Sequence, residues 1–265
     1  MTTSSSGAGL QLRGVGLRYF SLDGETEALS DISLSLRPGE FVSIIGPSGC
    51  GKSTLLSLIS GILAPTEGDV LLDGVVVASP SRRIGYMLQQ DYLFEWRSIL
   101  DNAVLGAEVQ GMDLGRARAR ATRLLETYGL GDFLHHRPRQ LSGGMRQRVA
   151  LARTLCTEPD VVLLDEPFSA LDAQTRLALA DDVSDILRRE GKTVVLVTHD
   201  IGEAVSMTDR VIVLSRRPGR IKSDHAIEFG GPDGQRPTPF EARSRPEFNG
   251  YFNTLWKEID VHDEN

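Results

Sequence analysis

The stretch Gly46-Pro47-Ser48-Gly49-Cys50-Gly51-Lys52-Ser53 decides the fold of this chain, because it stands between a short apolar run and a helical pattern. It fits the pattern Gly-x-x-x-x-Gly-Lys-Ser/Thr, in which a Gly-rich turn binds nucleotide phosphates. Backbone N–H groups turn toward the phosphates, and the N-terminus of the following helix adds its favourable dipole. An ordinary Gly-rich turn would need neither Lys52 nor Ser53. We therefore expect Lys52 at the β- and γ-phosphates of a bound nucleotide and the Ser53 hydroxyl on Mg²⁺. The ATP-binding residues expected here are Gly46, Pro47, Ser48, Gly49, Cys50, Gly51, Lys52, Ser53 and Thr54.

The segments around this loop predict an α/β core. Residues 41–45, 161–164 and 193–197 are short and almost continuously apolar, and each precedes a loop and a helical pattern. Such runs are typical of parallel strands buried on both faces. Residues 10–36 instead alternate apolar and polar side chains, and Asp73-Gly74 separates two short apolar runs. Alternation and a two-residue Asp-Gly turn favour an antiparallel sheet, which we expect as a wing beside the core.

A helical insert is expected at about residues 92–158. Apolar residues recur there at three- and four-residue steps, first between Leu114 and Tyr128 and again between Met145 and Cys156. Steps of this size place the apolar side chains on one face of a helix. No apolar run typical of a buried strand interrupts the segment, so it is predicted to interrupt the α/β core as a helical subdomain.

A carboxylate pair follows the second apolar run. Asp165 ends the run that begins at Val161, and Glu166 comes next. A carboxylate at the end of such a strand supports Mg²⁺ in phosphate-loop hydrolases. Acidic pairs also start helices, since acids favour helix N-termini. Pro167 intervenes here, so we favour Asp165 as a Mg²⁺ contact and Glu166 as the general base that accepts a proton from the attacking water.

A third motif, Leu141-Ser142-Gly143-Gly144-Met145, opens a helical pattern with a hydroxyl and two glycines. Alone it would be a flexible helix start. Together with the phosphate loop and the acidic pair it makes residues 10 to about 220 resemble the ATPase subunit of ATP-binding-cassette (ABC) transporters. The resemblance implies a P-loop NTPase (RecA-like) parallel-sheet core with an antiparallel β wing and a helical insert. It also implies a head-to-tail homodimer, in which Ser142, Gly143 and Gly144 contact the ATP held by the opposite subunit.

Further positions take their expected roles from this resemblance alone. Gln89 resembles the glutamine that binds Mg²⁺ and senses the γ-phosphate, and His199 resembles the catalytic histidine that contacts the γ-phosphate. Asp172 resembles a residue that touches the opposite subunit and its ATP. Tyr19 resembles the aromatic residue that stacks on adenine, with Phe20 as its rival and a place in the core as the other interpretation. Outside the resemblance, Gln89 and His199 would be solvated loop residues.

A narrower similarity concerns the transported solute. Residues 215–221 and 245–248 are similar to the nitrate/sulfonate/taurine-type importers, whose relatives also import thiamine-pyrimidine precursors. The segment Leu93-Phe94-Glu95-Trp96-Arg97 departs from the Leu-Leu-Pro-Trp more usual there. Because this segment faces the membrane partner in the family, the departure leaves the partner and the solute open.

Net charge and cysteine content limit the other classes of protein to which the chain could belong. A net charge of −7 argues against nucleic-acid binding, because phosphate contacts need a basic surface. The two cysteines are not expected to pair, which favours a reducing compartment. The first residues lack a signal-peptide pattern, and no apolar run approaches the ~20 residues that span a bilayer. We expect a cytoplasmic protein, peripheral on the inner face of the cell membrane through its partners.

The segments at the two ends are expected to lie outside the ATPase domain. Residues 1–9 are predicted to be a disordered lead, and residues 221–244 a linker rich in Gly and Pro. Residues 245–265 are expected to form an amphipathic helix and a tail. The aromatic stripe of this helix is predicted to pack against its own domain.

The sequence thus predicts the ATP-hydrolysing subunit of a bacterial importer. Its expected partners are a second copy of itself, transmembrane permease subunits and, indirectly, a solute-binding protein. A soluble ABC-type ATPase acting on nucleic acid or ribosomes is the alternative. Such proteins usually carry two cassettes, coiled coils or basic surfaces, which this chain lacks. A small-molecule kinase would leave residues 141–145 and His199 unexplained.

Overall fold

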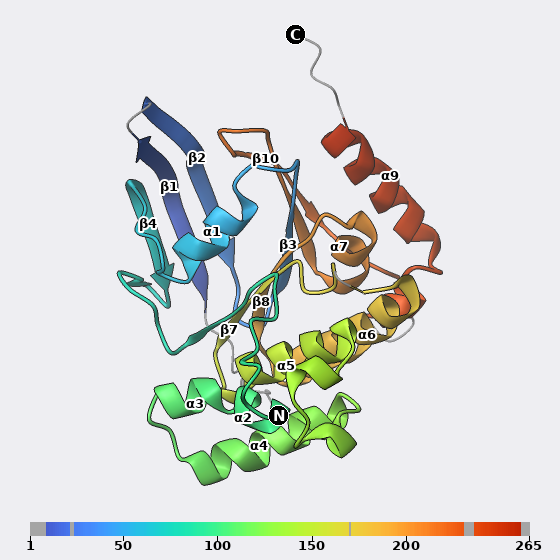
Figure 1. Ribbon diagram of the computed structural model, residues 1–265. Coiled ribbons are helices and arrows are strands. Elements are labelled where there is room, and N and C mark those ends of the chain that lie inside the picture. The colour runs from blue at the N-terminus through green and yellow to red at the C-terminus, as the bar shows by residue number, and fades with distance from the viewer. Residues whose placement is uncertain (1–8, 22–23, 170, 231–235, 261–265) are drawn as a thin grey trace, which may run out of the picture.

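The computed structural model describes residues 9–21, 24–169, 171–230 and 236–260. Two sheets organise the fold (Figure 1). The central sheet has the strand order β10-β9-β3-β8-β7-β6, and the wing has the order β2-β1-β4-β5. The central strands are β3 (Phe41–Ile45), β6 (Ile84–Met87), β7 (Val161–Asp165), β8 (Thr193–Val197), β9 (Arg210–Leu214) and β10 (Ile221–Ala226). The wing strands are β1 (Leu10–Ser21), β2 (Gly24–Leu36), β4 (Glu67–Leu72) and β5 (Val75–Val76).

The central strands are parallel except β10, and both faces of the sheet are covered. Along β7, Val162 and Leu164 pack into one hydrophobic core, and Val161 and Leu163 pack into another. Successive side chains of a strand point to opposite faces of the sheet. A strand that packs into a core on both faces therefore has a continuously apolar sequence. The predicted parallel core with an antiparallel wing is confirmed.

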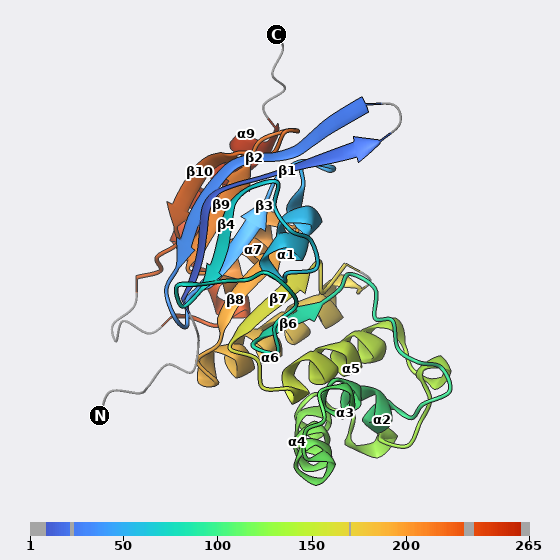
Figure 2. The same cartoon turned by 90° about the vertical axis from the view of Figure 1, so that its left-hand side faces the viewer.

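Helix α1 (Lys52–Ile59) lies between the wing and the central sheet, as Figures 1 and 2 show. Its buried residues Leu55, Leu56, Leu58 and Ile59 join side chains of both sheets in one core. This packing fixes the helix that begins at the phosphate loop. On the opposite face of the sheet lie α6 (Ala173–Arg189) and the helical insert.

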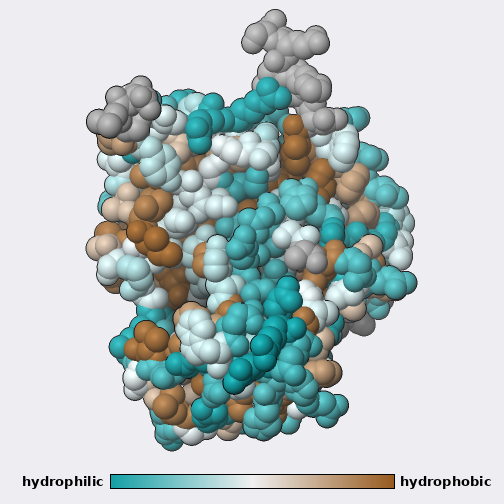
Figure 3. Space-filling model, in the orientation of Figure 1, coloured by the Kyte–Doolittle hydropathy of each residue, from teal (hydrophilic) through white to brown (hydrophobic). Residues whose placement is uncertain are grey.

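The insert consists of α2 (Ile99–Ala103), α3 (Leu105–Val109), α4 (Leu114–Thr127), the short 3₁₀ turns η1 (Gly131–Phe133) and η2 (Pro138–Gln140), and α5 (Gly143–Cys156). It extends from one end of the sheet core (Figure 2). In the space-filling view, the surface of this half of the molecule is mainly hydrophilic, with the hydrophobic residues in separate patches (Figure 3). Arg120 of α4 pairs with Glu158 and Glu190, so it ties the insert to the end of α6.

The C-terminal part differs from the expected linker at residues 221–244. Ile221–Ala226 form β10, which pairs antiparallel with β9, and α8 (Pro239–Ala242) follows. The strand is an edge strand with half-buried and exposed residues in alternation, so it has no apolar signal in the sequence. Helix α9 (Pro246–Asp260) then packs through Phe248 and Leu255 against α7 (Ile201–Met207) and β9. Of the expected disordered lead, residues 1–8 lie outside the described residues, as do residues 261–265 of the tail.

Candidate functional site

The phosphate loop connects β3 to α1. Gly51 is the N-cap of α1 with φ 102°, and no side chain caps the N–H groups of the first turn, which leaves them available to a ligand. The φ of 102° favours glycine at this position, and a Cβ atom there would also lie 2.7 Å from Leu29 Cδ2 and 3.2 Å from Ala28 O of β2. Lys52 Nζ donates hydrogen bonds to Gly46 O (2.8 Å) and Pro47 O (2.9 Å). The loop therefore presents backbone donors and an ammonium group on one side, as an anion site requires.

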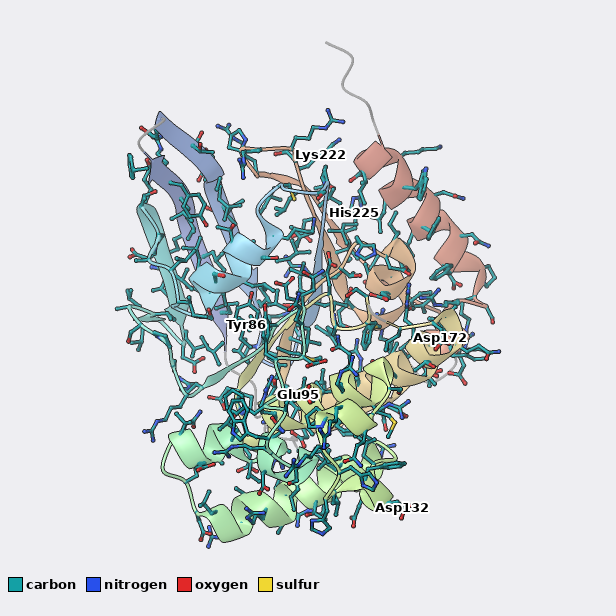
Figure 4. All side chains as sticks on the ribbon, in the orientation of Figure 1. Tyr86, Glu95, Asp132, Asp172, Lys222 and His225 are labelled. Atoms are coloured by element: carbon teal, nitrogen blue, oxygen red, sulfur yellow. The ribbon has the colours of Figure 1, made fainter. Side chains whose placement is uncertain are left out.

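A hydroxyl and a carboxylate meet at the base of this loop. Ser53 Oγ donates to Asp165 Oδ1 (3.2 Å), and Tyr86 Oη donates to Asp165 Oδ2 (3.2 Å). Burial raises the pKa of the Asp165 carboxyl, and the two hydrogen bonds oppose that rise. Burial and the Asp165 charge raise the pKa of Tyr86, so the phenol stays protonated and remains a donor. Tyr86, labelled in Figure 4, thus orients the carboxylate from the neighbouring strand.

The ends of β6, β7 and β8 bring three further side chains together. Gln89 Nε2 donates to Glu166 Oε2 (2.8 Å), and His199 Nδ1 lies 3.3 Å from Glu166 Oε1. Glu166 has φ 46°, a left-handed conformation that is rare outside glycine. Its backbone N–H donates to Val197 O at 2.8 Å, which fixes the strained residue against β8. Such strain persists where the surrounding structure enforces it, and it often occurs at functional sites.

These groups line one pocket of about 600 Å³, a size suited to a nucleotide. Of the residues expected at the site, the pocket is lined by Gly46, Ser48, Gly49, Gly51, Lys52, Ser53, Thr54, Gln89, Glu166 and His199. Asp165 lies behind Ser53. Cys50 is 1% exposed and packs into the core, so only its backbone belongs to the loop surface. Carboxylate, amide and hydroxyl oxygens are ligands that suit Mg²⁺, and Ser53, Asp165 and Gln89 offer them here.

Tyr19 is not among the pocket-lining residues. It lies on β1 of the wing opposite Thr26 of β2, and it is 43% exposed. Phe20, its rival, is 74% exposed. The expected stacking of Tyr19 on adenine therefore stays a prediction, as does the choice between the two residues.

The residues expected at the opposite subunit lie apart from the pocket. Ser142 is the N-cap of α5, and its Oγ accepts a hydrogen bond from Met145 N (3.3 Å). Gly144 lies against the start of α6, where a Cβ atom would be 3.1 Å from Leu171 Cδ2. Asp172 caps α6 by accepting from the N–H groups of Gln174 and Thr175. Figure 4 shows Asp172 well separated from Tyr86. These residues and Gly143 are not among the residues that line the phosphate pocket of their own chain.

Sequence reasoning missed two residues of the site. Tyr86 holds Asp165, although a tyrosine in a strand is ordinarily a core residue. Arg217 lines the pocket from the turn between β9 and β10. The stretch around Arg217 stood out only by its similarity to one subfamily, which assigned the arginine no role. Neither contact has a local sequence signal, because each joins residues far apart in the chain.

Comparisons with known proteins agree with this arrangement. The family model described as "ABC transporter" matches residues 29–169. The "Uncharacterized ABC transporter ATP-binding protein YtlC" of Bacillus subtilis (strain 168) is 48% identical over 242 residues, which cover 91% of this chain and 92% of that protein. The "Taurine import ATP-binding protein TauB" of Roseobacter denitrificans is 41% identical over 255 residues, which cover 94% of each chain.

A solved structure shares the fold. The "Dimeric structure of a post-hydrolysis state of the ATP-binding cassette MJ0796 bound to ADP and Pi" matches with a TM-score of 0.74 and 34% identity. The match covers 83% of this chain and 100% of that one. Within the described residues, no helix combines the length and the apolar character needed to cross a bilayer.

Proposed function

The chain belongs to the ABC transporter family, and we propose that it is the ATP-hydrolysing subunit of an importer for a small solute. The proposal rests on the contacts of Glu166 with Gln89 and His199 beside the phosphate loop. The phosphate loop alone would support nucleotide binding. A carboxylate held beside the expected position of the γ-phosphate supports hydrolysis as well.

Each group has a role in the proposed reaction. The loop N–H groups and Lys52 bind the phosphates and offset their charge. Glu166 accepts the proton of the water that attacks the γ-phosphate. Gln89 and His199 hold the Glu166 carboxylate in place and extend toward the γ-phosphate. Ser53, Asp165 and Gln89 would hold Mg²⁺, which supplies charge neutralisation at the phosphates when bound. Tyr19 is proposed to stack on adenine.

The proposed unit is a head-to-tail homodimer. Ser142, Gly143, Gly144 and Asp172 lie apart from their own pocket and would complete the pocket of the opposite copy. Support comes from the solved dimer of a related cassette. Two ATP molecules would then be bound between the subunits, and hydrolysis would let the pair separate.

The proposed membrane partner is a permease that binds near Phe94 and Trp96. Their rings stack with centroids 4.7 Å apart, and Trp96 is 70% exposed. Asn102 holds this loop, since its side chain accepts from Phe94 N and donates to Phe94 O and Ser98 O. Docking there would place the chain on the inner face of the cell membrane. A solute-binding protein would act on the permease, not on this chain.

The proposed solute class is that of the nitrate/sulfonate/taurine-type importers, with thiamine-precursor import as the second possibility within the same group. Support comes from the similarity of residues 215–221 and from relatives named as taurine import proteins. The alternative of a nucleic-acid or ribosome-bound ATPase has no support in these names.

Purification of the tagged chain from membrane extracts tests the proposal. We expect a permease to co-purify and the ATPase rate of the complex to rise when taurine and its binding protein are added. Nitrate and a thiamine precursor serve as comparison solutes. Recovery of the chain with nucleic acid and without a membrane protein would contradict the importer.

A further inference from the structure

The turn between β9 and β10 lies against the phosphate loop. Gly219 N donates to Ala28 O at 2.9 Å, and Ser30 N donates to Gly219 O at 3.0 Å. A Cβ atom at Gly219 would lie 2.2 Å from Cys50 O, so the turn approaches the loop backbone as closely as glycine allows. These contacts fix residues 215–219 beside the nucleotide pocket. The backbone that carries Arg216 and Arg217 is therefore held in place relative to the loop.

The two adjacent arginines of this turn face different surroundings. Arg217 lines the phosphate pocket together with Lys52 and Glu166. Arg216 lines a separate hollow with Pro47, Lys222 and Glu258. The two residues carry the same charge and are adjacent in the chain, but of the two only Arg217 lines the phosphate pocket.

The Arg217 guanidinium has no partner among the described residues, in contrast to the other charged groups of the pocket. Lys52 Nζ is bonded to two loop carbonyls, and both oxygens of Glu166 have a neighbour. A guanidinium carries five N–H donors, which match two phosphate oxygens at once. Because Arg217 and Lys52 line the same pocket, Arg217 brings a second positive charge to it.

We propose that Arg217 is a further nucleotide-binding residue, whose guanidinium binds the phosphate chain of the ATP held by its own subunit. The inference rests on the nucleotide site proposed above. The other interpretation is a solvated surface arginine that happens to border the pocket. A charge-assisted hydrogen bond from an exposed side chain predicts a loss of ATP affinity of about 5- to 30-fold when that side chain is truncated.

Arg217→Ala, Arg217→Lys and the matched control Arg216→Ala test the proposal. Calorimetric titrations of the full chain with ATP, ADP and adenosine measure the affinities, and thermal melting checks the fold. We expect Arg217→Ala to weaken ATP and ADP binding by about 5- to 30-fold and Arg217→Lys to weaken it less. Arg216→Ala should remain within about twofold of the parent chain, since it removes the same charge outside the pocket.

Lys52→Ala separates failure of this inference from failure of the site. If Lys52→Ala weakens binding while Arg217→Ala matches Arg216→Ala, the site stands and the role of Arg217 is rejected. Unchanged binding by Lys52→Ala would reject the site itself, and the Arg217 inference with it. An equal loss of adenosine affinity in Arg217→Ala would place the contact on the base and overturn the phosphate assignment.

Discussion

Gln89 Nε2 donates a 2.8 Å hydrogen bond to Glu166 Oε2, which joins the loop after β6 to the end of β7 across the phosphate pocket. His199 lies 3.3 Å from the other carboxylate oxygen. Glu166 is thereby held from two sides, and its left-handed backbone (φ 46°) turns its side chain into the pocket. An acid held in this way is well placed to accept a proton from water at the γ-phosphate.

The first prediction concerns this carboxylate. Glu166→Gln keeps the size of the side chain but removes the base, so hydrolysis should fall by about 10²- to 10⁴-fold while ATP binding persists. An ATP-bound dimer should accumulate and be seen by size-exclusion chromatography. Glu95→Gln, at an exposed acid outside the pocket, serves as the control for the isolated chain. Hydrolysis near the parent rate in Glu166→Gln would reject the assignment.

The second prediction concerns Lys52. Its ammonium donates to Gly46 O and Pro47 O, and Lys52 lines the pocket, so Lys52→Ala removes a charge at the expected β- and γ-phosphates. ATP affinity should fall by about 3 kcal/mol, or roughly 150-fold, with the fold intact. Calorimetry measures the affinity, and Lys222→Ala removes an equal charge outside the pocket. The phosphate-loop interpretation does not survive if both variants bind ATP alike.

Much of the fold could be predicted because its signals are local. Residues 161–164 form an unbroken apolar run because their strand is buried on both faces, and Asp73-Gly74 marks the turn between β4 and β5. The strand β10 could not be predicted in this way. Its half-buried residues Ser223 and His225 are polar and are held through Glu258 of α9, a contact that sequence spacing does not reveal.

The same distinction applies to the site, where some residues have a local sequence signal and others do not. Lys52 and Ser53 follow from one contiguous motif, and Glu166 from its place after an apolar run. The contact of Tyr86 with Asp165 joins residues 79 positions apart, and the place of Arg217 depends on how β9 and β10 lie against the loop. Such contacts depend on the tertiary fold, so a single sequence does not indicate them.

The third prediction concerns pH. Glu203 is 3% exposed, and burial raises its pKa from 4.5 to about 7, although Thr198 Oγ1 donates to it at 2.6 Å. Below the unfolded pKa the carboxyl is protonated in both states, so its contribution to stability is fully present there. As the pH rises toward 7 the unfolded chain loses the proton first, and the free energy of unfolding falls.

Glu203→Gln removes this titration. As the pH rises from about 5 to about 8, the free energy of unfolding of the parent chain should fall by about 1–3 kcal/mol more than that of the variant. Urea unfolding at several pH values measures the difference, and Glu228→Gln is the exposed control. The same pH dependence in parent and variant would show that Glu203 is not the group responsible.

The fourth prediction concerns the proposed permease surface. Trp96 is 70% exposed and stacks on Phe94, and Trp256 of α9 is 54% exposed and stacks on Phe252. Trp96→Ala should reduce co-purification of the permease, since exposed aromatic residues often anchor interfaces. Trp256→Ala should leave it unchanged, and both variants should bind ATP normally. Equal recovery of the permease with both variants would remove the assignment of this surface.

The last prediction concerns the dimer. Ser142 caps α5 in the insert and lies outside the pocket that Ser48 lines, so only a second copy could bring the two positions together head-to-tail. Cysteines placed at Ser48 and Ser142 should cross-link between chains when ATP is bound, in the Glu166→Gln background that retains it.

The native Cys50 and Cys156 are 1% exposed and should not compete. A cysteine pair at Ser48 and the exposed Thr127 serves as the control. Denaturing electrophoresis separates linked dimers from single chains. Linking that forms equally well without ATP, or only within one chain, would rule out the head-to-tail arrangement.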